Sequence, residues 1–297
     1  MQTENWVKHR ERGSGALIKL LAFLSLRIGR WFGRAMLYPI CAYFVVFAPR
    51  ARRASQQYLS LNLGRAPGIR DVFHHLHVHA SVLLDRIFIM ASGTRRFRLH
   101  INGLEVIEHQ AREKQGCILL GAHIGSFEIL RSLADQHNVP VKVMMYLNMS
   151  QKFNQMLSSI NPSFVDSIIP LGNPASLIEA AQFVRAGGMV AILGDRTVGN
   201  ERTAEAQFFG RTAAFPIGPL LLSTVMRVPV IFFVGLYGGN NVYHIYFEKF
   251  SDPPLNQGRD LPSELVEVWV NRYAQFLERY CMLAPYNWFN FFDFWRH

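Results

Sequence analysis

Residues 116–130 read GCILLGAHIGSFEIL, and this stretch decides the fold of the chain. An apolar run from Cys117 to Leu120 ends at a Gly-Ala step, and His123 follows directly. After the Gly125-Ser126 step, apolar residues return at helical spacing from about Glu128 onward. This succession indicates a buried strand, a turn and the start of a helix. Such a turn can bring polar side chains to the edge of a cleft while the strand behind it stays buried.

The same alternation continues along the chain. The apolar runs that predict strands are VKVMMYL at 141–147, FVDSIIPL at 164–171 and MVAILGD at 189–195. The amphipathic stretches that predict helices lie at 124–136, 151–160 and 175–186. Strands that alternate with helices indicate an α/β fold, in which helices cover a mostly parallel central sheet.

The last third of the chain predicts a hairpin between two helices. PVIFFVGLYG at 229–238 and NVYHIYFEKF at 241–250 are joined by a Gly-Gly-Asn-Asn segment, which is typical of a hairpin turn. Helices are expected over 216–226 and 262–281. No internal repeat or low-complexity linker interrupts this region, so we expect residues 96–297 to form one domain that follows a helical region at 1–95.

Composition favours contact with lipid. Half of the 297 residues are hydrophobic, and 31 Lys and Arg against 21 Asp and Glu give a net charge of +10. A basic chain suits an anionic membrane, nucleic acid or an acidic protein. The 23 phenylalanines favour lipid, and we expect no nucleic-acid partner. Cys41, Cys117 and Cys281 are far apart, which indicates a reducing compartment without disulfides.

Two apolar runs near the N-terminus, at 16–28 and 35–48, are too short for a confident transmembrane helix. We therefore expect membrane-associated helices that lie in the bilayer interface. The side chains expected at headgroup level are Arg27, Arg30, Arg34, Trp31 and Tyr38. The basic residues at 50–53 would then face the cytoplasmic leaflet. A soluble helical hairpin packed on the following domain is the alternative.

Two histidines in the apolar stretch 71–90 raise the question of a metal site. His75 and His79 are four residues apart and could bind a metal from one helix face. No third ligand follows at a fixed spacing, so we expect a polar helix face near the cleft and no metal.

The pattern His-x4-Asp/Glu occurs twice, as His123 with Glu128 and as His100 with Glu105. Only His123 follows a predicted buried strand, so its context favours a catalytic role. If His123 lies outside the helix, the Glu128 carboxylate can fold back to the Nδ1-H group and leave Nε2 as a general base. Two helical positions five apart would face each other poorly.

Other roles for this stretch are open. Ser126 could be a nucleophile, although the sequence around it is not G-x-S-x-G. Cys117 lies inside the apolar run and is expected to be an inert core thiol. His123 and Glu128 could also serve as a structural cap without catalysis.

AHIGSFEILR resembles the catalytic motif of the bacterial lipid A late acyltransferases, a branch of the lysophospholipid acyltransferase superfamily. Further blocks resemble the family in the same order, and together they cover the chain from Leu99 to the C-terminus. These blocks are MMYLN, ILGDRTVGN, FFGRTAAFPIGPLLLSTVMRVPVIF and APYNWFNFFDFW.

The resemblance implies an O-acyltransferase at the cytoplasmic face of the inner membrane. It would move a fatty acyl chain from an acyl carrier protein or coenzyme A thioester to a hydroxyl of a lipid or glycolipid, without a cofactor. The family motif makes His123 and Glu128 the catalytic pair. The substrate-binding residues that it implies are Gly125, Ser126, Asp195, Arg196, Phe209, Gly210 and Arg211.

Details of that assignment stay open. Many family members carry Gln where this chain has Arg196, and a guanidinium can bind phosphate or carboxylate. Asp195 and Arg196 could instead form a local ion pair. The tetrahedral oxyanion is expected to bind Arg196 or the backbone N–H groups of the Gly125-Ser126 turn. The methionines that could line a chain-length pocket are Met144, Met145, Met149 and Met156.

Three alternative functions remain at this point. A lipid esterase or thioesterase would use water in place of a hydroxyl acceptor on the same residues. A non-catalytic protein that binds lipid would need neither member of the catalytic pair. An acyltransferase could also act on a specialised acceptor, such as an aryl polyene or an ornithine lipid, in place of a lipid A precursor.

Overall fold

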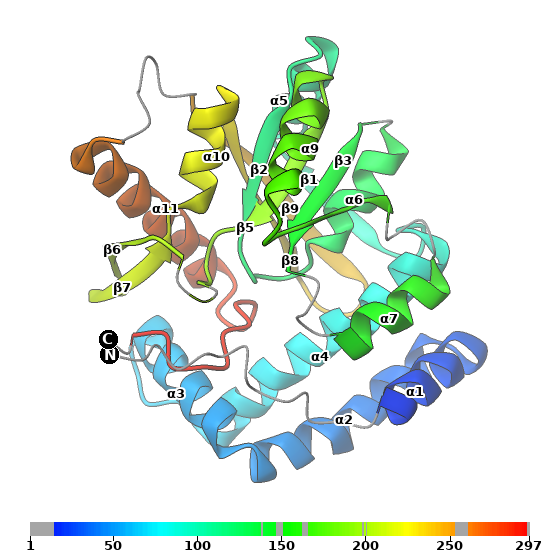
Figure 1. Cartoon of the computed structure of the whole chain (residues 1–297). Helices are drawn as coiled ribbons and strands as arrows, with labels where there is room; N and C mark the ends of the chain where they lie inside the picture. The colour runs from blue at the N-terminus through cyan, green and yellow to red at the C-terminus, as the bar shows by residue number, and fades with distance from the viewer. Residues whose placement is uncertain are drawn as a thin grey trace.

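A mainly parallel sheet of seven strands forms the centre of the part of the chain that the structure, a computed structural model, describes: residues 15–137, 139–146, 151–161, 166–197, 199, 201–252 and 261–295. The strand order is β1-β9-β8-β2-β5-β3-β4, and among these neighbours only β8 and β9 are antiparallel (Figure 1). The strands are β1 (Arg98–Asn102), β2 (Cys117–Gly121), β3 (Val141–Met145), β4 (Ile168–Pro170), β5 (Met189–Leu193), β8 (Val230–Tyr237) and β9 (Val242–Ser251). The predicted α/β class and the predicted β8–β9 hairpin are confirmed.

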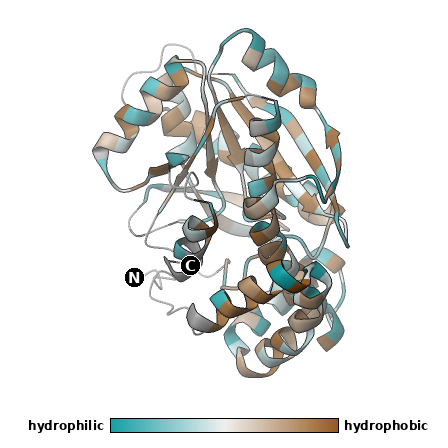
Figure 2. Cartoon of the chain, turned by 90° about the vertical axis from the view of Figure 1, so that its right-hand side faces the viewer, coloured by the Kyte–Doolittle hydropathy of each residue, from teal (hydrophilic) through white to brown (hydrophobic). Residues whose placement is uncertain are grey.

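Helices cover both faces of this sheet. Alternate residues of β2 point to opposite faces, and all of them are buried. Leu120 packs in a cluster with α9, α10 and α11, whereas Leu119 packs in a cluster with α4, α5 and α6. Figure 2 shows the central strands coloured mainly as hydrophobic. The helices are α1 (Gly15–Ile28), α2 (Arg30–Phe47), α3 (Pro49–Leu63), α4 (Ile69–Ser92), α5 (Leu104–Arg112), α6 (Glu128–Gln136), α7 (Gln151–Ile160), α9 (Pro174–Arg185), α10 (Gly218–Met226) and α11 (Ser263–Leu283).

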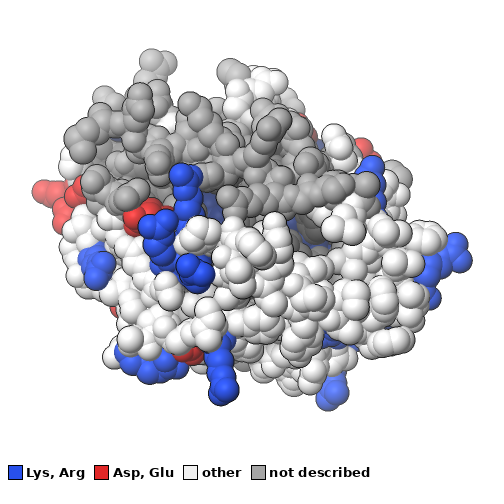
Figure 3. Space-filling view, turned by 90° about the horizontal axis from the view of Figure 1, so that it is seen from below, with Lys and Arg blue, Asp and Glu red and all other residues white. Residues whose placement is uncertain are grey.

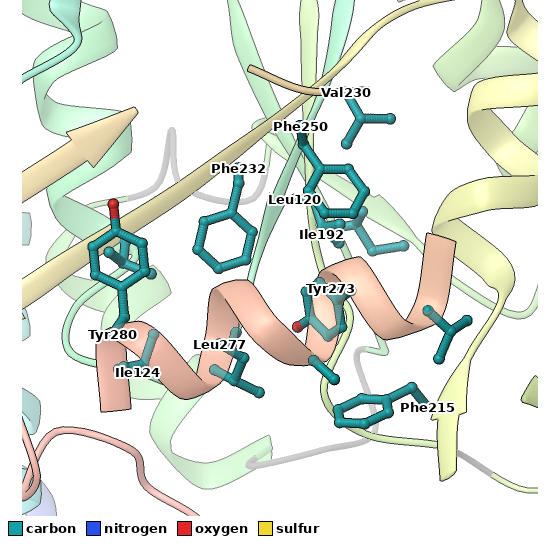
Figure 4. Close-up of a cluster of buried hydrophobic side chains, with 14 of the residues drawn as sticks. Leu120, Ile124, Ile192, Phe215, Val230, Phe232, Phe250, Tyr273, Leu277 and Tyr280 are labelled. Atoms are coloured by element: carbon teal, nitrogen blue, oxygen red, sulfur yellow. The ribbon is translucent and has the colours of Figure 1, made fainter. Parts of the chain in front are cut away.

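Helix α11 packs along the sheet through a row of aromatic side chains. Tyr273 and Phe232 have ring centroids 5.9 Å apart, and Phe250 packs beside both (Figure 4). The Tyr273 hydroxyl donates a hydrogen bond of 2.9 Å to the carbonyl of Gly121, at the end of β2. Each buried aromatic ring contributes about 1.5 to 3 kcal/mol by the area it removes from water. This packing holds the carboxyl end of β2 in place.

The helix predicted over 124–136 begins later, at Glu128. Residues 124 and 125 form isolated bridges with Trp288 and Gly235 instead. Gly125 has a φ of +61°, and a Cβ there would lie 2.0 Å from the carbonyl oxygen of Gly235. The turn therefore follows the neighbouring backbone and leaves His123 outside the helix, as predicted.

β6 (Thr203–Phe208) and β7 (Arg211–Pro216) form a hairpin that was not predicted from the sequence. Its two turn residues, Phe209 and Gly210, have φ values of +52° and +68°. A two-residue loop with positive φ at both positions matches the twist of a hairpin. Phenylalanine is a poor signal for such a turn, because a side chain disfavours positive φ.

Two arginines of α2 face the protein, contrary to the expectation that they lie at headgroup level. Arg30 pairs with the buried Asp85 of α4 through hydrogen bonds of 2.6 and 2.7 Å. Arg34 donates to the hydroxyl of Tyr237 and, over 3.0 Å, to the carbonyl of Asn240 at the β8–β9 turn. These bonds anchor α2 to α4 and to the sheet.

Taken alone, each described helix falls short of the combination of length and apolarity that crossing a bilayer requires. Helices α2 and α3, bent by 94° at their junction, reach that threshold only as a pair.

We expect Asp85→Asn to destabilise the protein by about 3 kcal/mol, because it leaves the guanidinium of Arg30 without its buried counter-charge. Urea unfolding followed by circular dichroism measures the change. Asp252→Asn is the matched control. Because Asp252 pairs with Lys249 at the surface, this substitution should change the free energy of unfolding by less than about 0.5 kcal/mol. Equal stability of the wild type and Asp85→Asn would contradict the prediction.

Candidate active site

A cavity of about 590 Å³ opens at the carboxyl ends of the parallel strands. Its wall takes residues from α4, from the turn after β2, from the ends of β3 and β5, and from α10. Side chains that follow neighbouring parallel strands meet at one edge of the sheet, which is where α/β proteins commonly bind ligands. The cavity therefore joins the segments that the sequence analysis singled out.

His123 and Asp195 form a hydrogen-bonded pair at this edge. His123 follows β2 and Asp195 follows β5, and these two strands are parallel neighbours with Gly121 opposite Leu193. The His123 Nδ1 atom lies 2.7 Å from Asp195 Oδ1. The backbone N–H of His123 also reaches the carboxylate, at 3.1 and 3.0 Å from its two oxygens. The carboxylate accepts a hydrogen bond from the Nδ1-H group, so Nε2 keeps a lone pair for a substrate proton.

The surroundings keep the imidazole neutral and the carboxylate charged. Burial, followed by the charge of Arg196, lowers the pKa of His123 below its usual value, and Asp195 opposes this only in part. Burial alone would raise the pKa of Asp195, but its interaction with the imidazole of His123, the positive charge of Arg196 and the hydrogen bond from Trp288 hold it at about 2. The pair is therefore poised as a general base and its fixed counter-charge.

Glu128 does not take the place predicted for it. The expectation that its carboxylate binds Nδ1 of His123 is wrong, because Asp195 occupies that position. Glu128 begins α6 and forms a buried ion pair with Arg86 of α4. It also accepts a hydrogen bond of 3.2 Å from the hydroxyl of Ser126. Its first-turn position directs it toward α4, which the spacing along the chain could not reveal.

Arg86 and Arg196 both line the cavity with His123. Arg86 lies in an almost fully buried pair, with its side chain 10% exposed and that of Glu128 3% exposed. Arg196 donates a hydrogen bond of 2.6 Å to the carbonyl of Phe289. Both guanidiniums lower the pKa of His123, so both lie close enough to act on charge that forms beside it. Arg196 was predicted from the sequence, whereas Arg86 was not, because no motif in its helix marks it.

The backbone donors expected at the turn after His123 are already engaged. The N–H of Gly125 donates to the carbonyl of Asn287 over 2.8 Å, and that of Ser126 donates to the carbonyl of Gly235 over 2.8 Å. Neither group is directed at the cavity, so the prediction that they bind an oxyanion is not supported. Two candidate donors for the oxyanion are the guanidiniums of Arg196, which was part of that prediction, and of Arg86, which the structure adds.

Three of the residues implied by the resemblance lie elsewhere. Phe209 and Gly210 form the turn of the β6–β7 hairpin, Arg211 begins β7, and none of the three lines the cavity. The backbone N–H of Phe209 donates to Glu278 of α11 over 2.6 Å. Ser126 is buried and is not part of the cavity wall either. Asp195 and Arg196 lie at the site, and Gly125 lines the cavity itself.

The remaining wall is mainly apolar. Its aliphatic and methionine side chains include Val82, Leu83, Val143, Met144, Met145, Leu171, Leu177, Ile192, Leu193, Leu221, Leu222, Val225 and Met226. Two of the methionines predicted to line a chain pocket are therefore present in it. Met149 and the side chain of Met156 fall outside the described residues. No described serine, threonine or cysteine lines the cavity.

The other nucleophile and metal candidates have structural partners. His75 is buried between the hydroxyl of Ser55 and the carbonyl of Trp288, at 2.9 and 2.8 Å. His79 lines the cavity, and burial lowers its pKa to about 3. Burial raises the pKa of the Cys117 thiol to about 12, which makes it unreactive. Among the described residues, no three His, Cys, Asp or Glu side chains form a group that could hold a metal ion.

Comparison with known families gives one match. The family described as bacterial lipid A biosynthesis acyltransferase matches residues 79–297, which is well over half of the chain. The match begins within α4 and therefore includes Arg86, His123 and Asp195. No curated protein is detectably similar to the chain.

We expect His123 to titrate below the pKa of a free histidine, about 6.5, because burial and Arg196 disfavour the imidazolium. In Asp195→Asn the pKa should fall further, since the imidazolium loses its counter-charge. Nitrogen-15 NMR of histidine side chains, assigned with His123→Gln, measures both values. A pKa at or above 6.5 in the wild type would contradict the charge arrangement described for the site.

Proposed function

Because the chain belongs to the bacterial lipid A biosynthesis acyltransferase family, we propose that it moves a fatty acyl group from a thioester donor to a hydroxyl of a lipid A precursor or a related glycolipid. The donor is an acyl carrier protein or coenzyme A thioester. The observation that supports this proposal is the His123–Asp195 pair at the wall of an apolar cavity. A base beside a space suited to hydrocarbon is what acylation of a hydroxyl requires.

In the proposed reaction, Nε2 of His123 removes the proton of the acceptor hydroxyl while its oxygen attacks the thioester carbonyl. Asp195 stabilises the imidazolium that forms and keeps its Nδ1-H oriented. The tetrahedral intermediate then expels the thiolate, which takes the proton from His123. An ester and a free thiol are the products, and His123 returns to its neutral state.

The acceptor hydroxyl is proposed to attack directly, without an acyl-enzyme. The described cavity wall contains no serine, threonine or cysteine beside His123. The hydroxyl of Ser126 is buried and donates to Glu128. Direct attack therefore agrees best with the side chains that line the cavity.

Arg86 and Arg196 are proposed to stabilise the oxyanion of the tetrahedral intermediate. Both line the cavity wall with His123, and both are held by protein groups before a substrate arrives. Preorganised positive charge in a site with little water lowers the energy of a developing anion. Glu128 then acts through Arg86, by holding the guanidinium in place.

The acyl chain is proposed to lie along the apolar wall between the end of β3 and helix α10. Met144 and Met145 of β3 and Leu221 and Leu222 of α10 all line the cavity. Methionine adapts its shape to flexible apolar ligands, which suits a hydrocarbon chain. The polar groups lie around His123, so the thioester would be placed there.

We propose that α1 and α2 hold the protein on the cytoplasmic face of the inner membrane. The inward direction of Arg30 and Arg34 leaves an outer face of α2 that carries no charged side chain among those described as exposed. Trp31 and Phe47 on this face are 70% and 60% exposed. Figure 3 shows a largely uncharged surface seen from below, with Lys and Arg scattered around it. Such an apolar face with basic surroundings suits an anionic lipid surface.

We expect His123→Ala and Asp195→Asn to lower kcat about 10²-fold or more, because each removes part of the general base. The assay uses mass spectrometry to follow transfer of a saturated fatty acyl group from an acyl carrier protein or coenzyme A thioester to a lipid A precursor. Glu179→Gln is the control, since Glu179 is an exposed partner of Lys142 away from the dyad.

Two results would contradict the proposed reaction. Release of free fatty acid at the same rate with and without the lipid acceptor would indicate a hydrolase that uses water. Full activity of Asp195→Asn combined with loss of activity in Glu128→Gln, at equal folded fractions, would show that Glu128 is the partner of His123 after all.

We expect Trp31→Glu combined with Phe47→Glu to weaken binding to vesicles of phosphatidylethanolamine and phosphatidylglycerol about 100-fold or more, since each side chain loses about 1.5 kcal/mol or more of burial in lipid. Vesicle flotation measures the bound fraction. Val268→Glu, an exposed position on α11, is the control. Unchanged flotation of the double variant would exclude this face as the membrane contact.

A further inference from the structure

The C-terminal tail, which we define as residues 284–295 after α11 (red in Figure 1), contacts the turn that carries His123. The N–H of Phe289 donates to the carbonyl of His123 over 2.8 Å, and the carbonyl of Asn287 accepts from the N–H of Gly125 over 2.8 Å. These two bonds flank Trp288 and pair the tail with the turn as a short antiparallel bridge. The tail is thus part of the framework that holds His123.

Between these two bonds, the side chain of Trp288 reaches the carboxylate of Asp195. Its indole Nε1 donates a hydrogen bond of 2.9 Å to Oδ2, whereas Oδ1 faces Nδ1 of His123. Both carboxylate oxygens also accept from the backbone N–H of His123, but their side-chain partners differ, with the indole bonded to Oδ2 and the imidazole to Oδ1. One oxygen is therefore bonded to a fixed side-chain donor and the other to the catalytic base.

The indole ring itself is held by its surroundings. Trp288 is fully buried, and edge-to-face contacts with Tyr58, Phe208 and Phe294 place their ring centroids 4.9, 5.2 and 5.0 Å away. Its carbonyl accepts from Nε2 of His75 over 2.8 Å, which fixes the backbone as well. A ring packed on several sides cannot turn its N–H away from Asp195 without moving the core.

We propose that Trp288 is a positioning residue of the reaction, whose indole N–H fixes the rotation of the Asp195 carboxylate so that Oδ1 stays in line with Nδ1 of His123. The inference rests on the proposed function for its kinetic consequence only. The terminal torsion of an aspartate is broad, and the backbone N–H of His123 is shared between both oxygens, so without the indole the carboxylate can rotate more freely and carry the imidazole with it. Tryptophan suits this role because its indole N–H can only donate a hydrogen bond and its ring is rigid.

A purely structural role for Trp288 would predict different behaviour. Phenylalanine keeps most of the apolar ring that packs against Tyr58 and Phe208, so the core would lose little of its burial. The bond to Asp195 would be lost, and one oxygen of a buried carboxylate would lose a donor. The two roles are therefore separable by removing only the N–H group.

We expect Trp288→Phe to lower kcat about tenfold while KM stays within about twofold, because substrate still binds but the base is held less well. Trp295→Phe is the matched control. Trp295 is the other indole donor of the tail, and it bonds to the carbonyl of Phe208 over 3.2 Å rather than to Asp195. An equal loss of kcat in the two variants would assign the effect to packing of the tail and overturn the proposal.

A second measurement does not depend on turnover. Nitrogen-15 histidine labelling reports the Nδ1-H proton of His123, which should be sharp in the wild type and in Trp295→Phe, and should broaden through faster exchange with water in Trp288→Phe. If Trp288→Phe does not fold, β-(3-benzothienyl)alanine at position 288 replaces the N–H by sulfur within the same ring shape. An unchanged Nδ1-H signal in that protein would overturn the proposal. If the wild type transferred no acyl group at all, the proposed function would fail while this signal still tested Trp288.

Discussion

The carboxylate of Asp195 is the interaction on which the candidate site depends. It accepts from the backbone and the side chain of His123 and from the indole of Trp288, so it joins the turn after β2, the end of β5 and the C-terminal tail. A buried carboxylate is costly unless donors surround it. Here the donors are the groups that must be positioned, so the same bonds that offset burial also orient the base.

A buried ion pair lies beside the His123–Asp195 pair. Arg86 and Glu128 connect α4 to the start of α6, beside the turn that carries His123. A buried ion pair contributes little net stability, but loss of one partner leaves an uncompensated charge. The role of the Arg86–Glu128 pair at this position is to hold a guanidinium in place in the cavity wall. The acid of the His-x4-Glu pattern thus acts on the site through a neighbouring helix.

Helix α4 links the site to the N-terminal helices. It contributes Arg86 and His79 to the cavity, and its Asp85 binds Arg30 of α2. Because Arg30 and Arg34 turn toward the protein, the outer face of α2 keeps its apolar side chains exposed. The bonds that fasten α2 to the protein therefore also leave uncharged the face that we propose for membrane contact. This face belongs to a helix that packs against α4, which lines the cavity.

The sequence by itself determined the local structure, and the tertiary structure decided which side chains meet. Apolar periodicity and glycines predicted the parallel sheet, the β8–β9 hairpin and the position of His123 outside the helix, because these depend on neighbouring residues. The His-x4-Glu spacing suggested Glu128 as the partner of His123. Asp195 was identified only through the family resemblance, as a substrate-binding residue. The partner is Asp195 because β2 and β5 are adjacent parallel strands, so their carboxyl ends lie together although 72 residues separate the two side chains. Strand order and the path of the C-terminal tail arise from packing of the whole chain, and no local pattern encodes them.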